Sequence, residues 1–315
     1  MPEQGLREVE HEITVRTPAA TVYRLIAEVE NWPRIFPPTV YVDHVERGGS
    51  EERIRIWATA NGEAKNWTSR RTLDPDALRI TFRQEVSTPP VAAMGGSWII
   101  EPLSAEESRI RLLHDYRAVD DDPDGLAWID RAVDRNSRSE LAALRTNLEL
   151  GATAEDLLLS FEDTVRIDGS VDDVYDFVNE AQHWSERLPH VAKVRLQEDT
   201  PGLQVLEMDT LTKDGSTHTT KSVRVCLPRR RIAYKQIGLP ALLSLHTGFW
   251  QFTESDGGVV ATSQHTVVLD AANIERVLGE GADVARAREF IRNALGTNSR
   301  ATLALAKAYA EGRRA

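Results

Sequence analysis

The chain has 315 residues, of which 41% are hydrophobic, and its formal net charge is −11 at pH 7. An acidic chain without a basic tail argues against nucleic acid as a partner, because phosphate binding needs clustered cations. No apolar run approaches the roughly 20 residues of a membrane span, the first residues lack the apolar stretch of a secretion signal, and the single cysteine, Cys226, excludes an internal disulfide and a cysteine-rich zinc site. We therefore expect a cytoplasmic protein with no membrane partner.

The first half of the chain predicts a strand, a short helix, several strands and a long helix, in that order. Residues 8–16 alternate in polarity, and Thr17 and Pro18 then suit the N-cap and the first position of a helix. Five or six β-type segments follow between residue 40 and about 118, separated by turn signals. A helix with regularly spaced apolar residues is expected from about 126 to 150.

The second half repeats this order. A strand is expected over about 160–168, a helix over about 171–181 with Ser170 as its N-cap, and further strands from 190 to about 269. A long helix follows over about 271–310, and we expect it to be interrupted near 278–281.

Matching signatures relate the two halves. Val22-Tyr23 returns as Val174-Tyr175, Trp32 as Trp184, and Gly96 and Trp98 as Gly248 and Trp250, always at an offset of 152 residues. Such a repeat indicates a duplicated domain of ordinary size, with boundaries at 1–152 and 153–315. The run at 136–138 returns at 298–300, so about ten residues were added in the second copy, near 278–283.

Strands followed by a terminal helix in each copy predict the α+β class. The expected architecture is two tandem helix-grip domains, in each of which a curved antiparallel sheet wraps around a long C-terminal helix. An internal cavity can remain between the sheet and the helix.

One face of the strand at 63–73 carries chemically distinctive residues. With a period of two, Lys65, Trp67, Ser69 and Arg71 share a face. If that face points into the cavity, it presents an aromatic wall, a hydroxyl and a fixed cation. Structural interpretations remain open, since tryptophans usually belong to a core and Arg71 could face solvent.

The order of elements and these residues resemble the START/Bet v1-like superfamily and, within it, the didomain aromatase/cyclases of bacterial type II polyketide synthases. The resemblance covers nearly the whole chain. It implies that Arg71 and Ser69 are catalytic. It also implies substrate-binding roles for further residues of the first copy, namely Trp32, Phe36, Trp67, Arg83, Trp98 and Asn136.

The chemistry of such an enzyme suits these residue types. Ring closure of a poly-β-ketone is an intramolecular aldol addition, and an always-protonated guanidinium can stabilise the oxyanion that develops. Ser69 can hold a water or relay a proton, and tryptophan walls exclude water and shape the chain. Holding the reacting carbons together can itself supply about 7–11 kcal/mol of the barrier reduction.

At a constant offset of 152, the second copy differs on this face. Trp67, Ser69 and Arg71 align with Thr219, Lys221 and Val223. The hypothesis is that the N-terminal copy carries the catalytic face and the C-terminal copy a second pocket or a structural partner. Its candidate substrate-binding residues are Trp184, Lys221, His246, Trp250 and Asn298.

The resemblance further implies closure and dehydration of the first ring of a ketoreduced poly-β-ketone bound to an acyl carrier protein, beside other synthase subunits. The basic turn at 229–231 is a candidate docking point for that carrier. The histidines lack metal-ligand spacing and no nucleotide fingerprint is present, so we expect neither a metal nor a cofactor. A non-catalytic START-like carrier of an apolar molecule is the alternative, and a different hydrolase or lyase on the same fold is a third.

Overall fold

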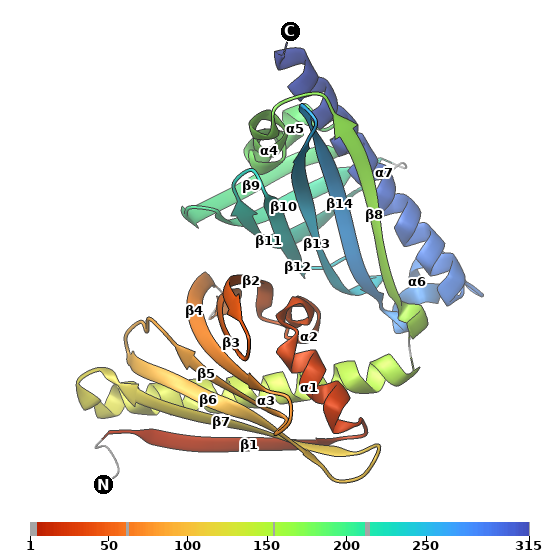
Figure 1. Cartoon of the computed structure of the whole chain (residues 1–315). Coiled ribbons are helices and arrows are strands. Elements are labelled where there is room, and N and C mark those ends of the chain that lie inside the picture. The colour runs from red at the N-terminus through yellow and green to blue at the C-terminus, as the bar shows by residue number, and fades with distance from the viewer. Residues whose placement is uncertain (1–4, 61–62, 154, 212–214, 315) are drawn as a thin grey trace. The chain divides into compact units, whose positions relative to one another are not determined.

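A computed structural model describes residues 5–60, 63–153, 155–211 and 215–314. The chain forms two compact units, Met1–Thr153 and Ala154–Ala315 (Figure 1). The sequence placed the boundary after residue 152.

The N-terminal unit contains one seven-stranded antiparallel sheet, in the order β1-β7-β6-β5-β4-β3-β2. Its elements along the chain are β1 (Arg7–Val15), α1 (Ala19–Ala27), η1 (Val29–Asn31), α2 (Trp32–Ile35), β2 (Thr39–Gly48), β3 (Glu51–Ala60), β4 (Glu63–Asp74), β5 (Arg79–Gln84), β6 (Val91–Pro102), β7 (Ser108–Ala118), η2 (Val119–Asp121) and α3 (Pro123–Thr153).

The C-terminal unit has the same topology, with the strand order β8-β14-β13-β12-β11-β10-β9. Its elements are η3 (Glu155–Leu157), β8 (Leu158–Ile167), α4 (Val171–Asn179), η4 (Ala181–His183), α5 (Trp184–Arg187), β9 (Val191–Thr200), β10 (Leu203–Leu211), β11 (Thr217–Leu227), β12 (Arg231–Gly238), β13 (Leu243–Ser255), β14 (Gly258–Leu269), η5 (Ala271–Asn273), α6 (Ile274–Leu278) and α7 (Val284–Arg313).

The long helix of each unit covers one face of its sheet. Helix α3 packs on β1 and β7, and α7 packs on β8 and β14 (Figure 1). Strands with alternating burial, such as β14, have one face in the core, as expected for an antiparallel sheet covered on one side. The predicted α+β class and the helix-grip architecture are confirmed.

The helix boundaries show local causes. Ser170 caps α4, because its hydroxyl accepts a hydrogen bond from the Asp173 amide at 3.0 Å. The predicted cap at Thr17 was wrong, since α1 begins one residue later, after Pro18, without a side-chain cap. The expected interruption of the last helix is present: α6 ends at Leu278, and Gly279 follows in a left-handed conformation that favours glycine.

The strand pairings show that the offset between the copies is not constant. Ile54 pairs with Ser69 in the first sheet, and Leu206 pairs with Ser222 in the second. The offset is therefore 152 on β10 but 153 on β11. It returns to 152 on β12, where Tyr234 opposite Arg224 corresponds to Phe82 opposite Arg71. One residue was added between β10 and β11, and one was lost between β11 and β12.

Among the helices of the described ranges, none is both long and apolar enough to cross a membrane.

Candidate active site

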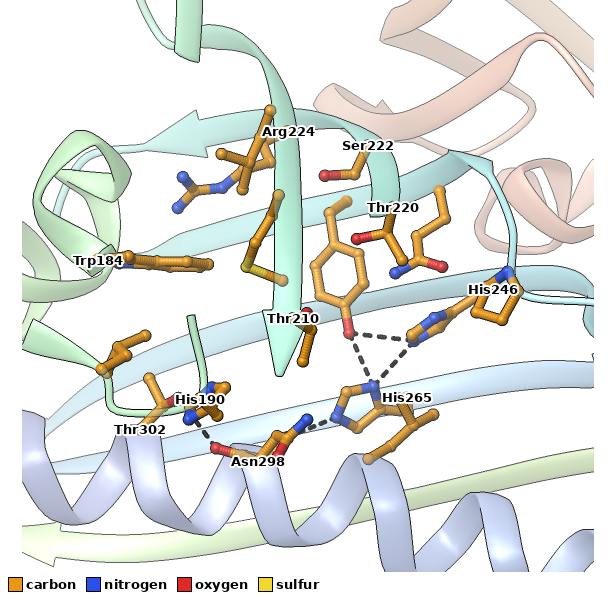
Figure 2. A pocket seen from close by; sticks show the side chains of 18 of the residues that line it. Trp184, His190, Thr210, Thr220, Ser222, Arg224, His246, His265, Asn298 and Thr302 are labelled. Carbon is orange, nitrogen blue, oxygen red and sulfur yellow. Dashed lines mark hydrogen bonds between the residues drawn. The ribbon is translucent and has the colours of Figure 1, made fainter. Parts of the chain in front are cut away.

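A cavity lies inside the C-terminal unit, between its sheet and α7 (Figure 2). Its volume is about 140 Å³. An apolar cavity of about 150 Å³ holds a benzene molecule, so this one has room for about one six-membered ring. Its side chains come from α5, from β10 to β14 and from α7.

Trp184 and Arg224 lie together at one end of the cavity (Figure 2). The guanidinium carbon is 5.0 Å from the centre of the indole ring, and Nη2 donates a hydrogen bond to the Val178 carbonyl at 2.6 Å. This carbonyl belongs to the last turn of α4, where a cation is favourable. The Trp184 indole N–H also reaches this turn, at the Phe177 carbonyl. Burial lowers the pKa of Arg224.

His246 and His265 lie at the other end (Figure 2). They form a polar cluster with Tyr234 and Ser299, which also line the cavity. The His265 Nδ1 is 2.8 Å from the Tyr234 hydroxyl and 3.0 Å from the His246 Nε2. The His265 Nε2 is 2.7 Å from the Ser299 hydroxyl. These contacts join one phenol, two imidazoles and an alcohol in a continuous chain, through which a proton can pass.

Burial decides the protonation of this cluster. It lowers the pKa of His265 to about 4 and that of His246 well below its ordinary value, where the neighbouring His265 also contributes. Burial raises the pKa of the Tyr234 phenol. At neutral pH both imidazoles are therefore uncharged and can accept a proton, while the phenol keeps its proton and can donate it.

A glycine makes room for the phenol. A Cβ at Gly248 would lie 2.5 Å from the Tyr234 hydroxyl oxygen and 2.2 Å from the Gln264 carbonyl oxygen. In the first copy, a Cβ at Gly96 would lie 2.7 Å from the Phe82 ring. The repeated glycine of the sequence signature therefore accommodates an aromatic side chain on the neighbouring strand in both units.

In the N-terminal unit, Arg71 is 2% exposed and its side chain lies in the interior. It donates to the carbonyls of Ile26 and Ala27, lies 5.1 Å from the Trp32 ring centre and forms an ion pair with Glu52 at 3.1 Å. Burial lowers its pKa to about 10. Arg71 thus binds the end of α1, as Arg224 binds the end of α4.

The equivalence of these two arginines corrects the sequence alignment. Both arginines cover the tryptophan of their own repeat, and Ile26 and Val178 are separated by 152 residues. The counterparts of Ser69 and Arg71 are therefore Ser222 and Arg224, and both line the cavity. Lys221 was wrongly aligned with Ser69. It is exposed and lies on the opposite face of β11.

The remaining candidates of the first copy are distributed over the unit. Phe36 lies between Trp32 and Trp98, with ring-centre distances of 5.5 Å and 6.2 Å. Trp67 is half-buried against a second apolar cluster, and the Ser69 hydroxyl donates to the Arg83 carbonyl at 3.2 Å.

Arg83 and Asn136 do not join this group. The Arg83 side chain is 54% exposed and pairs with Asp115, away from the neighbouring inward-facing Phe82. Asn136 is exposed on α3. Its counterpart Asn298 lines the cavity, as do Trp184, His246 and Trp250.

Sequence reasoning missed Ser222, Arg224, Tyr234, His265 and Ser299. The Ser-x-Arg pattern is present in both copies, as Ser69 and Arg71 and as Ser222 and Arg224. The added residue before β11 shifts the second pattern out of alignment at a constant offset of 152. For His265 the sequence shows only that its spacing to other histidines does not suit a metal site. Its counterpart, His114, lies opposite Gly96 as His265 lies opposite Gly248, and its Nδ1 is 3.4 Å from the Ser137 hydroxyl.

Known proteins resemble this chain over nearly its whole length. A family model described as "Polyketide cyclase / dehydrase and lipid transport" matches residues 7–149 and again 159–311. The granaticin polyketide synthase bifunctional cyclase/dehydratase of Streptomyces virginiae is 58% identical, with 94% of this chain and 97% of that protein covered. The actinorhodin counterpart of Streptomyces coelicolor is 48% identical, with 98% and 99% covered.

Solved structures give the same result. The di-domain ARO/CYC BexL is 68% identical, with a TM-score of 0.92 and coverage of 97% of this chain and 99% of that chain. StfQ, a di-domain ARO/CYC of the steffimycin pathway, is 36% identical, with a TM-score of 0.90 and the same coverage.

The chain therefore belongs to the polyketide cyclase/dehydrase family, with the di-domain architecture of the aromatase/cyclases. The prediction of a polyketide aromatase/cyclase is confirmed, and the alternative of a non-catalytic carrier is not favoured. The named relatives are parts of polyketide synthases, which agrees with other synthase subunits as partners.

Proposed function

We propose that the cavity of the C-terminal unit is the place where the first ring is closed and aromatised. One observation carries this proposal. Tyr234, His265 and Ser299 are connected by short polar contacts, and they line a cavity with room for about one six-membered ring. The substrate would be a ketoreduced poly-β-ketone bound to an acyl carrier protein, in the cytoplasm. The resemblance of the sequence and the names of the relatives support this assignment.

The proposed closure begins with removal of an α-proton from a methylene between two carbonyls. Neutral His265 accepts that proton, and the resulting enolate carbon forms a bond to a distant carbonyl carbon. Tyr234 donates its proton to the new alkoxide oxygen and recovers one from the His265 imidazolium, 2.8 Å away. The product is a β-hydroxy ketone, and both side chains return to their initial protonation states.

Dehydration would use the same two groups. His265 removes the remaining α-proton, and Tyr234 protonates the departing hydroxyl, so that one water leaves and a double bond forms. The cation of Arg224 stabilises the enolate in both steps through its field in a low-dielectric cavity. Trp184 and Trp250 shape the ring and exclude water.

The test compares the histidines of the two units in reconstitution with the minimal synthase and the ketoreductase. His265→Ala should lower formation of the aromatic first ring by about a hundredfold, a typical loss for a general base. His114→Ala is the matched control, because it removes a half-buried imidazole at the corresponding position of the first sheet. Loss of product with His114→Ala and full activity with His265→Ala would assign the reaction to the N-terminal unit instead.

A further inference from the structure

The two buried arginines differ in what lies beside them. In the N-terminal unit the neighbour is Glu52, which is 5% exposed. One carboxylate oxygen is 3.1 Å from Arg71 Nη1, and the other is 3.1 Å from His44 Nε2. The positive charge of Arg71 is thus compensated within the interior.

At the corresponding position on β10 the C-terminal unit carries Gln204, an amide of nearly the same shape without charge. Gln204 is 2% exposed, and its Nε2 donates to the Glu198 carboxylate at 2.8 Å. Glu198 itself is exposed. Within the described part of the chain, neither Arg224 Nη1 nor Gln204 Oε1 has a hydrogen-bond partner, and the same holds for Arg71 Nη1 and Glu52 Oε1. The two sites therefore differ in the ion pair and not in hydrogen bonding at these atoms. No carboxylate of the described residues forms an ion pair with Arg224 at 4.0 Å or less, and the exposed Glu198 acts on its charge only from farther away. Among the described residues, Arg224 therefore has no carboxylate as close to it as Glu52 is to Arg71.

We propose that Gln204 is a specificity-determining residue, which leaves the Arg224 charge free to favour an anionic ring, enolate or phenolate, in the C-terminal cavity. Glu52 cancels the same effect in the N-terminal unit. A charge in a low-dielectric interior acts strongly on a nearby ligand, and a carboxylate beside it removes most of its field. The inference deepens the proposed function and rests on it for its catalytic meaning.

Binding of 4-nitrophenol to the full chain tests this proposal, because its phenol and phenolate forms absorb at different wavelengths. One aromatic ring fits the cavity volume of about 140 Å³. The wild type should bind phenolate about tenfold more tightly than phenol. In Gln204→Glu the preference should disappear, since Arg224 then acquires a carboxylate partner as Arg71 has.

Three controls separate charge from structure. Gln204→Leu stays uncharged and should keep the preference, and Glu52→Gln should leave it unchanged. Arg224→Met should abolish it, which provides a second route to the result if Gln204→Glu folds poorly. Thr220→Trp fills the cavity and should abolish binding. The proposal is overturned by equal binding of both forms to the wild type, by an unchanged preference in Gln204→Glu, or by binding that persists in Thr220→Trp.

This assay contains no polyketide, so its result is independent of the His265 experiment. A phenolate preference that depends on Gln204, together with full activity of His265→Ala, would uphold the charge assignment and refute the proposed reaction site.

Discussion

Tyr234 and His265 are the pair on which the proposed chemistry depends. Their contact at 2.8 Å exists because β12 and β14 both border β13 and because Gly248, between them, has no side chain. The first unit has the glycine and the histidine as Gly96 and His114 but carries Phe82 in place of the tyrosine. The phenolic proton donor therefore belongs to the C-terminal cavity.

Tyr234→Phe should lower the turnover number by about a hundredfold, because it removes the proton donor and keeps the ring. Tyr175→Phe is the control, since this buried tyrosine lies on α4 and its hydroxyl contacts Asn179. Single-turnover dehydration rates measure the effect. Equal rates for Tyr234→Phe and the wild type would exclude Tyr234 as the acid.

The buried imidazole of His265 should also make stability depend on pH. Its pKa is lowered from 6.5 to about 4 by burial, so the unfolded chain binds a proton that the folded chain does not. The free energy of unfolding should be constant above about pH 6.5 and should fall as the pH decreases toward 4. The contribution of His265 is about 2 kcal/mol at pH 5.

Urea unfolding of the wild type and of His265→Gln at pH 7.5 and pH 5 measures this contribution. The loss of stability between the two pH values should be smaller in the variant. His218→Gln is the control, because that histidine is exposed in the folded chain. An identical loss in the wild type and His265→Gln would contradict the assignment of a buried neutral imidazole.

At the level of helices and strands, each arginine joins an interior strand of its sheet to the end of the first helix of its unit and to a tryptophan. Arg71 connects β4 with α1 and Trp32, and Arg224 connects β11 with α4 and Trp184. This shared geometry indicates that the guanidinium positions the helix and the indole, and that its charge reaches the cavity through space.

Arg71→Met should lower the free energy of unfolding by about 3–5 kcal/mol, because it leaves the buried carboxylate of Glu52 without its cation. Adding Glu52→Gln should recover a large part of that loss. Arg224→Met should cost less than Arg71→Met, since no carboxylate of the described residues pairs with Arg224. Chemical denaturation of the wild type, both single variants of the pair, their double variant and Arg224→Met measures these differences. Strictly additive effects of Arg71→Met and Glu52→Gln would refute the ion pair.

At the scale of the whole molecule, the question is how the chain receives its substrate within a synthase. Delivery by an acyl carrier protein stays a prediction. The basic run at 229–231 lies in the turn after β11 and at the first residue of β12. The Arg229 side chain is 55% exposed and pairs with Asp172 and Glu254. These surface pairs are weak, because solvent screens them, so an acidic carrier can compete for Arg229.

Arg229→Glu should raise KM for the carrier-bound substrate several-fold and leave kcat unchanged, since the turn is not part of the cavity lining. Arg195→Glu is the control, because Arg195 is another exposed arginine with an acidic partner, on β9. The comparison uses steady-state rates with the carrier-bound substrate at low salt. The same KM for Arg229→Glu as for the wild type would remove this turn from the docking surface.

The duplication, the order of elements, the α+β class and the helix-grip architecture could be predicted from the amino-acid sequence, and the enzyme class was implied by the resemblance to a known family. Hydrophobic periodicity and repeated signatures such as Trp32 and Trp184 are local or regular features, so they can be recognised in the sequence without knowledge of the fold. The Ser170 cap and the interruption after Leu278 were found for the same reason.

The register of β11 could not be obtained in this way, because one added residue moves every side chain of a strand to the opposite face. Because of that shift, the constant offset aligned Lys221, and not Ser222, with Ser69. The equivalence of Arg224 and Arg71 was missed for the same reason. The contact between Tyr234 and His265, and the contrast between Glu52 and Gln204 beside equivalent arginines, depend on pairing across strands distant in sequence. Burial then decides which of these groups are charged, and burial is a property of the folded chain.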